Sequence, residues 1–344
     1  MHETMTWERS RDVRQLRTAA VDVWITLNAG ITNYAHDLSQ PVFAFVHAND
    51  FINLWQPRLP KPLRALNRIS RLPGMTRLSE LSQAWRKRQI AGGLRAVAGT
   101  LAVSRFSRDR CCEMYDMPVD DVVIVPPGID GRYFQEASPA SAGSALRLVT
   151  VSRLHRGAQR KNVDGVLEAI ASLSGEIKIR YAVIGTGDDS PRLEQLAERL
   201  GIAEQTTFLG DLSHDAVLAV YDRSDAFILA VKPSRTDFEG FGMVYAEAAA
   251  AGLPSIATAL GGIPDAVEDG VTGILLHESN PAAIADGIRR FVRECGRFDR
   301  ERIRAFARNL SAEACTATVE RVISQYFAHD PGAQNFPLRN ISSS

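Results

Sequence analysis

The chain has 344 residues, of which 45% are hydrophobic and 23% are charged, the composition of an ordinary globular protein with room for two domains of common size. The 40 basic and 40 acidic residues give a formal net charge of zero, but residues 1–140 hold 18 basic against 14 acidic residues, which leaves a balance of −4 for the rest. Neither half has the charge of a nucleic-acid-binding protein, so nucleic acid is not indicated as a partner.

The sequence also indicates the compartment. It contains no signal peptide and no apolar run long enough to cross a bilayer, so we expect a cytoplasmic protein. Its four cysteines, Cys111, Cys112, Cys295 and Cys315, lack metal-binding or paired spacing and are interpreted as reduced thiols.

The first part of the chain predicts a short α/β domain. Residues 1–20 are polar and predicted to be helical, and 31–39 are predicted to be a crossover helix between two buried parallel strands, 21–27 and 41–46. His47 directly follows the second strand, at the sheet edge where open α/β sheets bind ligands. Two more strands are predicted at 100–103 and 122–125, and the domain boundary at 135–145, which is rich in Ser, Ala and Gly.

A basic segment interrupts this domain. Residues 58–95 contain ten Lys and Arg against one acid, Glu80, with leucines at helical spacing and an aromatic residue, Trp85. One interpretation is a solvated helical face, with the arginines paired to acids of the more acidic second half. The other is a surface that binds an anionic membrane or an anionic acceptor.

The second part alternates regularly between strands and helices. Strands are predicted at 146–151, 177–184, 206–209, 225–229, 255–258 and 273–276, and helices at 161–172, 191–200, 214–222, 242–251 and 280–293. This alternation predicts a parallel sheet covered on both faces. Two further helices are expected at 299–308 and 312–327, and the last residues, 330–344, are expected to be disordered.

The most informative stretch is 236–254, a glycine-containing loop followed by an alanine-rich helix from Met243 to Ala251, with Gly252 as its C-terminal cap. Glu247 is the single charge in that helix, and it should point over the Met243 turn toward the loop that carries Glu239. The helix start offers free N–H groups and the positive end of the helix dipole. Two carboxylates beside an anion-binding helix start suit a nucleotide-sugar.

Other loops follow strands at the same edge. Arg153 and Lys161 follow the strand at 146–151 and are suited to binding a diphosphate. The turn at Gly185 and Gly187 is expected to allow the backbone to approach a ligand closely, and 261–264 form another glycine turn at this edge.

The ordered series of motifs resembles the nucleotide-sugar half of the retaining glycosyltransferases of family 4. It comprises Ser-Arg-Leu at 152–154 with Lys161, Val-Ile-Gly-Thr-Gly at 183–187, Glu239 to Glu247, Ala-Gly-Leu-Pro at 251–254, Gly-Gly-Ile-Pro at 261–264 and Asp-Gly-Val-Thr-Gly at 269–273. The resemblance covers residues 146–293. It implies the GT-B fold, an α/β architecture in which two Rossmann-like, doubly wound parallel-sheet domains face each other across a cleft. The N-terminal domain would be the short one.

The resemblance also implies roles for residues. Glu239 and the backbone of Gly240, Phe241, Gly242 and Met243 would hold the donor sugar, and Glu247 would bind the ribose. Arg153 and Lys161 would neutralise the diphosphate, His47 would orient the sugar or the acceptor, and no cofactor or essential metal is expected. The base would be recognised largely by the backbone near Gly185 and Leu209, so the residue types leave the base and the sugar open.

In the first domain, Phe-Val-His at 45–47 and Pro-Pro-Gly-Ile-Asp at 126–130 with Phe134 resemble family motifs. The family's opening strand with its glycine-rich loop has no counterpart before Val21, so either Met1 is not the natural start or this domain is truncated. The domains expected are 1–140 on the acceptor side, 145–310 for the nucleotide-sugar, and 311–329 as a helix returning to the first domain.

The predicted function is transfer of a sugar from a nucleotide-diphosphate-sugar to a glycan or lipid-linked acceptor in cell-surface polysaccharide or glycolipid synthesis. The predicted location is the inner face of an anionic membrane, reached through residues 58–95. Two alternatives remain: a sugar-nucleotide epimerase or phosphorylase of the same fold, and a non-catalytic nucleotide-sugar-binding protein.

Overall fold

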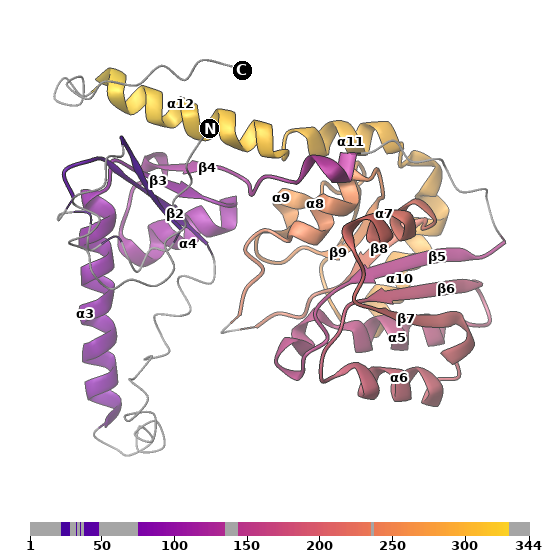
Figure 1. Ribbon diagram of the computed structural model, residues 1–344. Coiled ribbons are helices and arrows are strands. Elements are labelled where there is room, and N and C mark those ends of the chain that lie inside the picture. The colour runs from indigo at the N-terminus through magenta and orange to yellow at the C-terminus, as the bar shows by residue number, and fades with distance from the viewer. Residues whose placement is uncertain are drawn as a thin grey trace. The chain divides into compact units, whose positions relative to one another are not determined.

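A computed structural model describes residues 22–27, 32, 35, 38–47, 75–134, 144–234 and 237–329 (Figure 1). These residues form two compact units. Unit 1 comprises the described residues up to Val125 and from Val319 onward, and unit 2 runs from Pro126 to Thr318. The helix expected at 1–20, most of the one expected at 31–39, the basic residues 58–74 and the tail 330–344 lie outside the described residues.

Unit 1 contains the four expected strands in one parallel sheet of order β1-β2-β3-β4. The strands are β1 (Trp24–Thr26), β2 (Val42–Val46), β3 (Gly99–Ala102) and β4 (Val122–Ile124). Every residue of β2 is buried, which explains its uninterrupted apolar sequence, because a parallel strand covered on both faces has no solvent side. The expectation of a buried parallel strand is confirmed for β2, but it is wrong for β1, which pairs in parallel at the sheet edge and leaves Ile25 45% exposed.

Unit 1 also contains α3 (Met75–Ala96), which lies in the basic segment interpreted as helical, and α4 (Arg105–Tyr115), which was not predicted from the sequence and is followed by the short 3-10 helix η3 (Val119–Asp121). Ser104 caps α4 by accepting a hydrogen bond from the Ser107 N–H at 3.0 Å. The helices share one apolar cluster with the sheet, comprising Ala44, Val46, Ile90, Ala91, Leu94, Ala102, Cys111, Cys112, Tyr115 and Val122. Cys111 and Cys112 therefore act as small core residues, and all four cysteines are free thiols.

The last helix, α12 (Ala312–His329), begins in unit 2 and ends in unit 1. Its first residue donates a backbone hydrogen bond from Ala312 N–H to the Ile129 carbonyl at 3.0 Å. Near its other end, the ring of Tyr326 meets Phe43 of β2 edge-on, with centroids 5.7 Å apart. The helix expected at 312–327 is therefore present, and its final turns belong to the first unit.

Unit 2 contains the six expected strands in a parallel sheet of order β10-β9-β8-β5-β6-β7. They are β5 (Leu146–Val151), β6 (Ile179–Ile184), β7 (Thr206–Gly210), β8 (Ala226–Leu229), β9 (Ser255–Thr258) and β10 (Gly273–Leu276). The chain builds outward from β5 to β7, returns to the other side of β5, and builds outward again from β8 to β10. This is the doubly wound order, and the strand order reverses between β5 and β8.

Helices cover both faces of this sheet (Figure 1). One face is covered by α5 (Val163–Ser172), α6 (Ser190–Arg199) and α10 (Pro281–Glu294), whose apolar residues form a single core cluster with the strands. The other face carries α7 (His214–Asp222), α8 (Met243–Ala250), α9 (Ile263–Ala266) and α11 (Arg300–Arg308). On that face Phe227 of β8 packs edge-on against Tyr221 of α7 and Tyr245 of α8.

Four 3-10 segments complete unit 2: η4 (Gly131–Phe134), η5 (Arg156–Lys161), η6 (Ala203–Gln205) and η7 (Cys295–Arg297). The helix expected at 161–172 begins at Val163, because η5 precedes it and Asn162 adopts a left-handed conformation with φ of 62°. The expected glycine turn at 261–264 leads into α9, a single helical turn with a proline in its first positions.

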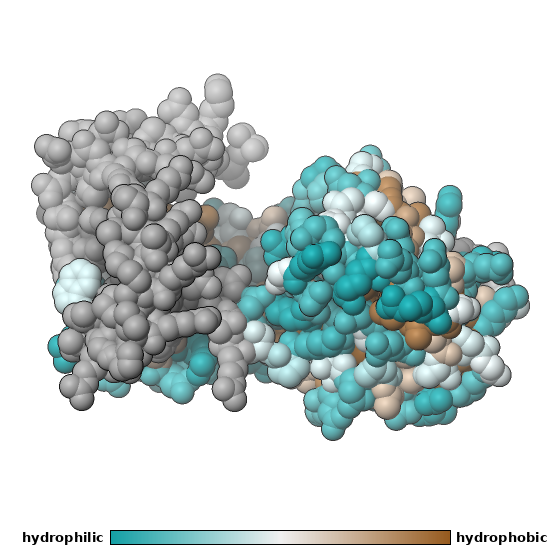
Figure 2. All heavy atoms as spheres, turned by 90° about the horizontal axis from the view of Figure 1, so that it is seen from below, coloured by the Kyte–Doolittle hydropathy of each residue, from teal (hydrophilic) through white to brown (hydrophobic). Residues whose placement is uncertain are grey.

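Figure 2 shows that one face of unit 2 is mostly hydrophilic, with apolar residues only scattered among the polar ones. Helix α6 illustrates the cause, because it buries Leu193 and Ala197 and leaves Glu194, Gln195 and Glu198 in solvent. None of the helices in the described part of the chain is long and apolar enough to cross a membrane.

Candidate functional site

The loops that follow β5 and β8 diverge at the point where the strand order reverses. In open α/β sheets this point, at the carboxyl ends of the strands, forms the ligand crevice. The β5 loop carries Arg153 and Lys161, and the β8 loop carries Glu239. Three of the predicted site residues therefore lie on the two loops that border this position in unit 2.

The structure pairs two of the predicted residues directly. Lys161 Nζ lies 2.6 Å from Glu239 Oε2, and each side chain is only 15% exposed. Arg160 Nη1 lies 3.4 Å from the same oxygen, and the Arg160 guanidinium also pairs with Asp237. Because these charges are largely shielded from water, their attraction is stronger than that of an ordinary surface ion pair. Arg160 and Asp237 were not among the predicted site residues.

Asn162 explains why Lys161 faces Glu239. It is fully buried, and its side-chain amide donates to the carbonyls of Ala230 at 2.7 Å and Ser279 at 2.8 Å. The Lys232 N–H adds a hydrogen bond to the Arg160 carbonyl at 2.7 Å. Asparagine tolerates the left-handed backbone found here better than most residues. The β5 loop is thus fastened to the segment that leaves β8.

A glycine pair fixes the backbone of Glu239 from the other side. A Cβ atom on Gly261 would lie 2.3 Å from the Glu239 carbonyl oxygen, and one on Gly262 would lie 2.0 Å from that of Gly240. The Gly262 N–H donates to the Glu239 carbonyl at 2.8 Å. Only glycine permits this close approach between the β9 and β8 loops. The Gly-Gly turn therefore positions the carboxylate-bearing loop.

Helix α8 starts and ends as the sequence indicates. Gly242, with φ of 91°, precedes the first helical residue, Met243, and the first N–H groups of a helix have no partner within it. Gly252, with φ of 75°, ends the helix, and the next N–H, of Leu253, donates to the Ala248 carbonyl at 2.8 Å. Phe241 is buried beneath the helix start. The expected helix start is therefore present after Gly242, and its binding of an anion stays a prediction.

Glu247 has different neighbours from Glu239. Its carboxylate lies beside the Tyr133 hydroxyl and His214, and burial raises its pKa above the usual value for Glu. The Tyr133 hydroxyl also lies 2.8 Å from His214 Nδ1. Tyr133 and His214 were not predicted from the sequence, because no pattern indicated that η4 and the start of α7 lie against α8.

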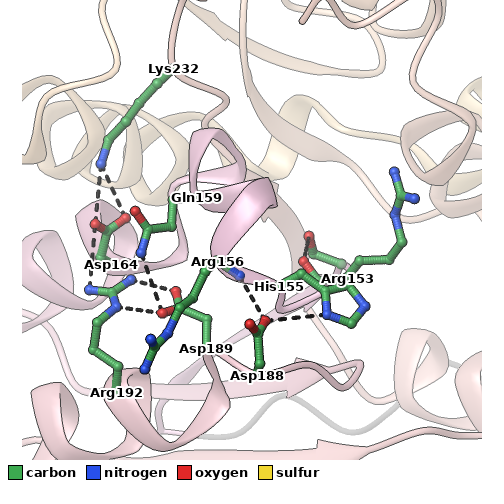
Figure 3. A network of polar contacts seen from close by, with 10 residues as sticks. Arg153, His155, Arg156, Gln159, Asp164, Asp188, Asp189, Arg192 and Lys232 are labelled. Atoms are coloured by element: carbon green, nitrogen blue, oxygen red, sulfur yellow. Dashed lines mark hydrogen bonds and ion pairs between the residues drawn. The ribbon is translucent and has the colours of Figure 1, made fainter. Parts of the chain in front are cut away.

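Arg153 points away from the other side chains of its loop (Figure 3). It is exposed, and among the residues that the structure describes no carboxylate pairs with its guanidinium. A cation without a protein partner at a strand end is available to an anionic ligand.

The rest of the β5 loop is held by acids of the loop after β6 (Figure 3). Asp188 accepts a hydrogen bond from the Arg156 N–H at 2.9 Å and lies 3.4 Å from His155 Nδ1. Asp189 is buried and is held by a bidentate pair with Arg192, both distances 2.7 Å; it accepts a hydrogen bond from the Gln159 amide at 3.4 Å, and its own N–H donates to the Leu154 carbonyl at 2.8 Å. These contacts anchor the loop between Arg153 and Lys161.

Gly185 and Gly187 touch protein backbone. A Cβ atom on Gly185 would lie 1.9 Å from the Ser152 carbonyl oxygen, and one on Gly187 would lie 2.0 Å from that of Leu154. This packing alone requires glycine, so a role in donor binding stays a prediction for both. Leu209 is half-buried in β7, next to Gly210, whose carbonyl accepts a hydrogen bond from the Gly185 N–H at 2.7 Å.

His47 belongs to unit 1. It follows β2, as expected, and its ring stacks on that of Phe45 with centroids 5.4 Å apart. Its role with the sugar or acceptor stays a prediction. Across the described residues, no group of three or more His, Cys, Asp or Glu side chains is arranged to hold a metal ion.

Comparison with known proteins identifies the family of unit 2. The model of the family described as "Glycosyl transferases group 1" matches residues 135–310, just over half of the chain. A D-inositol 3-phosphate glycosyltransferase of Mycolicibacterium gilvum is 40% identical over 168 residues, 47% of this chain and 37% of that protein. Its counterpart in Mycobacterium bovis is 35% identical over 210 residues, 59% of this chain and 43% of that protein. The chain thus spans less than half the length of these curated relatives.

Solved structures resemble this chain over the residues of both units. HepE of Anabaena in complex with UDP matches with a TM-score of 0.69 at 16% identity, over 91% of this chain and 82% of HepE. Sucrose-phosphate synthase of Thermosynechococcus elongatus matches with a TM-score of 0.67 at 16% identity, over 92% and 76% of the two chains. At such identity the likeness shows the fold alone. With the two parallel sheets, it confirms the expected α/β fold of GT-B type.

Proposed function

The chain belongs to the glycosyl transferases group 1 family, and we propose that it transfers a sugar from a nucleoside-diphosphate donor to an acceptor hydroxyl with retention at the anomeric carbon. The observation that carries this proposal is the contact of Lys161 with Glu239, 2.6 Å across the two loops that border the switch point. This contact places Lys161, which would bind a phosphate, directly beside Glu239. The Glu239 carboxylate can accept hydrogen bonds from sugar hydroxyls.

Each group has a part in this proposal. Lys161 and Arg153 neutralise the diphosphate and stabilise the negative charge that develops on it as the sugar leaves. Glu239 and the N–H groups at the start of α8 hold the sugar, and Glu247 accepts hydrogen bonds from the ribose. The nucleoside diphosphate would leave from the same face of the sugar that the acceptor hydroxyl attacks, taking up the hydroxyl proton, with His47 orienting the sugar or the acceptor. No metal is needed where protein cations and the helix start neutralise the phosphates.

The relatives suggest which substrates to try first. HepE has been solved with UDP and with UDP-glucose, so a UDP-sugar is the first donor to test. The similar bacterial proteins are named for D-inositol 3-phosphate, so a phosphorylated polyol is one acceptor to test beside glycans and lipid-linked sugars. We propose a glycan or lipid-linked acceptor for this chain, in cell-surface polysaccharide or glycolipid synthesis.

An anionic membrane would bring the enzyme to a lipid-linked acceptor. The described part of the basic segment supports this proposal, because Trp85 on α3 is 62% exposed and Lys87 and Arg88 beside it are exposed as well. An exposed Trp among cations suits a membrane interface. Co-sedimentation with anionic vesicles at low salt should therefore fall when Trp85, Lys87 and Arg88 are all changed to Ala. If the unaltered chain does not sediment, a soluble acceptor replaces the lipid-linked one.

A turnover assay tests the function. The chain is incubated with UDP-, GDP- and ADP-sugars, with and without the acceptors above, while nucleoside diphosphate release and the anomeric configuration of the product are measured. The proposal expects acceptor-dependent release and a retained configuration. A product formed without acceptor would indicate an epimerase, and dependence on inorganic phosphate a phosphorylase. Donor binding without turnover by any acceptor would indicate a binding protein.

A further inference from the structure

We propose that Tyr133 and His214 are positioning residues that hold the Glu247 carboxylate in place for the ribose of the donor. This inference rests on the proposed function, because it assigns Glu247 to the nucleoside. It concerns three side chains from three separate segments: η4, the first residue of α7, and the middle of α8. No sequence motif connects the three.

One hydrogen bond and two close neighbours define the arrangement of the three side chains. The Tyr133 ring is 4% exposed, so its direction is fixed by the surrounding protein. Its hydroxyl lies 2.8 Å from His214 Nδ1, and the two rings meet edge-on at 81° with centroids 5.3 Å apart. The segment η4 contacts α8, and the same hydroxyl lies beside the Glu247 carboxylate, where it favours the ionised form. Tyr133 therefore stands between the imidazole and the carboxylate.

The number of protons available decides which group donates and which accepts in each contact of Tyr133. A tyrosine hydroxyl has one proton to donate. If it donates that proton to the Glu247 carboxylate, it must accept a hydrogen bond from His214, which then carries its proton on Nδ1. Neutral His214 in this tautomer satisfies both contacts without an added charge. The reverse direction requires a protonated Glu247, which donates to the Tyr133 oxygen while Tyr133 donates to an unprotonated Nδ1.

The surroundings explain why the carboxylate needs such a donor. Burial raises the pKa of Glu247, and the Tyr133 hydroxyl acts in the opposite direction, toward the ionised form. The other titratable groups close to these side chains are Tyr221, whose environment includes Glu247, and Asp130 with its partner Arg132, which act on Tyr133. Ribose hydroxyls are donors, so an ionised carboxylate whose orientation is already fixed is what they require.

Binding of ribo- and dideoxy-nucleotides separates this role from a structural one. In Tyr133→Phe the carboxylate loses one donor, and the dissociation constant of the preferred nucleoside diphosphate should rise about tenfold, the usual scale for a hydrogen bond to a charged group. The 2′,3′-dideoxy diphosphate lacks the hydroxyls that would bond to Glu247, so it should bind more weakly than the ribonucleotide. Its dissociation constant should be the same for the unaltered chain and for Tyr133→Phe. Tyr221→Phe is the matched control, because the buried Tyr221 hydroxyl has no hydrogen-bond partner among the described residues, and affinity should be unchanged.

His214 provides a second test. His214→Ala should weaken ribonucleotide binding as Tyr133→Phe does, while His214→Asn should restore it, because an asparagine amide places an N–H close to where Nδ1 was. Nitrogen-15 NMR of the ligand-free protein should show the Nδ1-protonated tautomer of His214, and the more usual Nε2-protonated form in Tyr133→Phe.

The outcomes are distinguishable. If the unaltered chain binds no nucleoside diphosphate, the proposed function fails, and this inference fails with it. If the chain binds ribonucleotides but Tyr133→Phe binds them equally well, or loses ribo- and dideoxy-nucleotides to the same extent, only the inference is overturned. A thermal melt of each variant confirms that it is folded.

Discussion

Lys161 Nζ lies 2.6 Å from Glu239 Oε2, so the cation expected to bind the donor's phosphate and the carboxylate expected to bind its sugar neutralise each other in the protein alone. Arg160 adds a second cation 3.4 Å from the same oxygen. A bound donor would offer each group a new partner: phosphate oxygens for the cations and sugar hydroxyls for the carboxylate. The two loops are thus already held together in the protein alone, which would lower the cost of ordering them when the proposed donor binds.

Removing the cation should disable the enzyme with any donor. In Lys161→Ala, kcat/KM should fall at least about a hundredfold, because the departing diphosphate loses a preorganised positive charge. Lys178→Ala is the control, since Lys178 is an exposed cation at the amino end of β6, and it should keep full activity. Steady-state kinetics measure both, and unchanged turnover in Lys161→Ala would refute the phosphate assignment.

Removing the carboxylate should separate the binding of the phosphates from the binding of the sugar. In Glu239→Gln, the affinity for the free nucleoside diphosphate should rise several-fold, because Lys161 no longer has a competing anion. Turnover of the intact donor should fall, because an amide is a weaker acceptor for sugar hydroxyls. Calorimetry with the diphosphate and kinetics with the donor measure the two effects. Weaker diphosphate binding would mean that Glu239 helps to hold the nucleotide itself.

The strands of both sheets could be predicted because buried parallel strands are short runs of apolar, often β-branched residues, which residue type alone reveals. Lys161 and Glu239 could each be predicted from local sequence, but not their contact, because it joins loops 78 residues apart and depends on the strand order. Arg160 and Asp237 were missed because charged loop residues ordinarily lie at the surface.

Other differences have equally specific causes. Helix α4 was missed because its buried residues include Cys111 and Cys112 beside few large apolar residues, so its helical periodicity was weak. Gly185 and Gly187 were correctly predicted as a turn, but the close approach that they allow is to protein backbone. Tyr133 meets Glu247 only because η4 packs on α8, which no local pattern indicates.

The glycine pair after β9 should be essential for placing Glu239. In Gly262→Ala the new methyl group would overlap the Gly240 carbonyl, 2.0 Å away, so the loop must shift. We expect unit 2 to lose about 1–3 kcal/mol of stability, as overpacking usually costs, and donor binding to weaken at the same time. Gly175→Ala is the control, because its Cβ would have no atom within 4 Å. Thermal melts and donor titrations measure both effects, and native binding in Gly262→Ala would show that the loop does not depend on this packing.

The ionised carboxylate of Glu247 should lower the free energy of unfolding at neutral pH. Burial raises its pKa in the folded protein above the value in the unfolded chain, about 4.3. Above the folded pKa the carboxylate is charged in both states and its burial opposes folding; below the unfolded pKa it is neutral in both and has no such effect. Glu247→Gln should therefore raise the melting temperature at pH 7–8, and this gain should vanish as the pH falls toward about 4.

The matched control for Glu247→Gln is Glu194→Gln, which removes an exposed carboxylate from α6 and should not change the melting temperature. Melts of the three proteins across the pH range give the comparison. A lower melting temperature of Glu247→Gln at pH 8 would show that the ionised carboxylate stabilises the fold.

The most direct test of the central claim, that the loops after β5 and β8 bind a nucleotide-sugar, is isothermal titration calorimetry of the intact chain and of Lys161→Ala with UDP-, GDP- and ADP-sugars. At least one donor should bind the unaltered chain at one site with a dissociation constant of about 1 μM to 1 mM, the range in which enzymes usually bind their substrates, and Lys161→Ala should bind it at least about tenfold more weakly. Absence of binding by all three donors, or equal binding by the two proteins, would contradict the account.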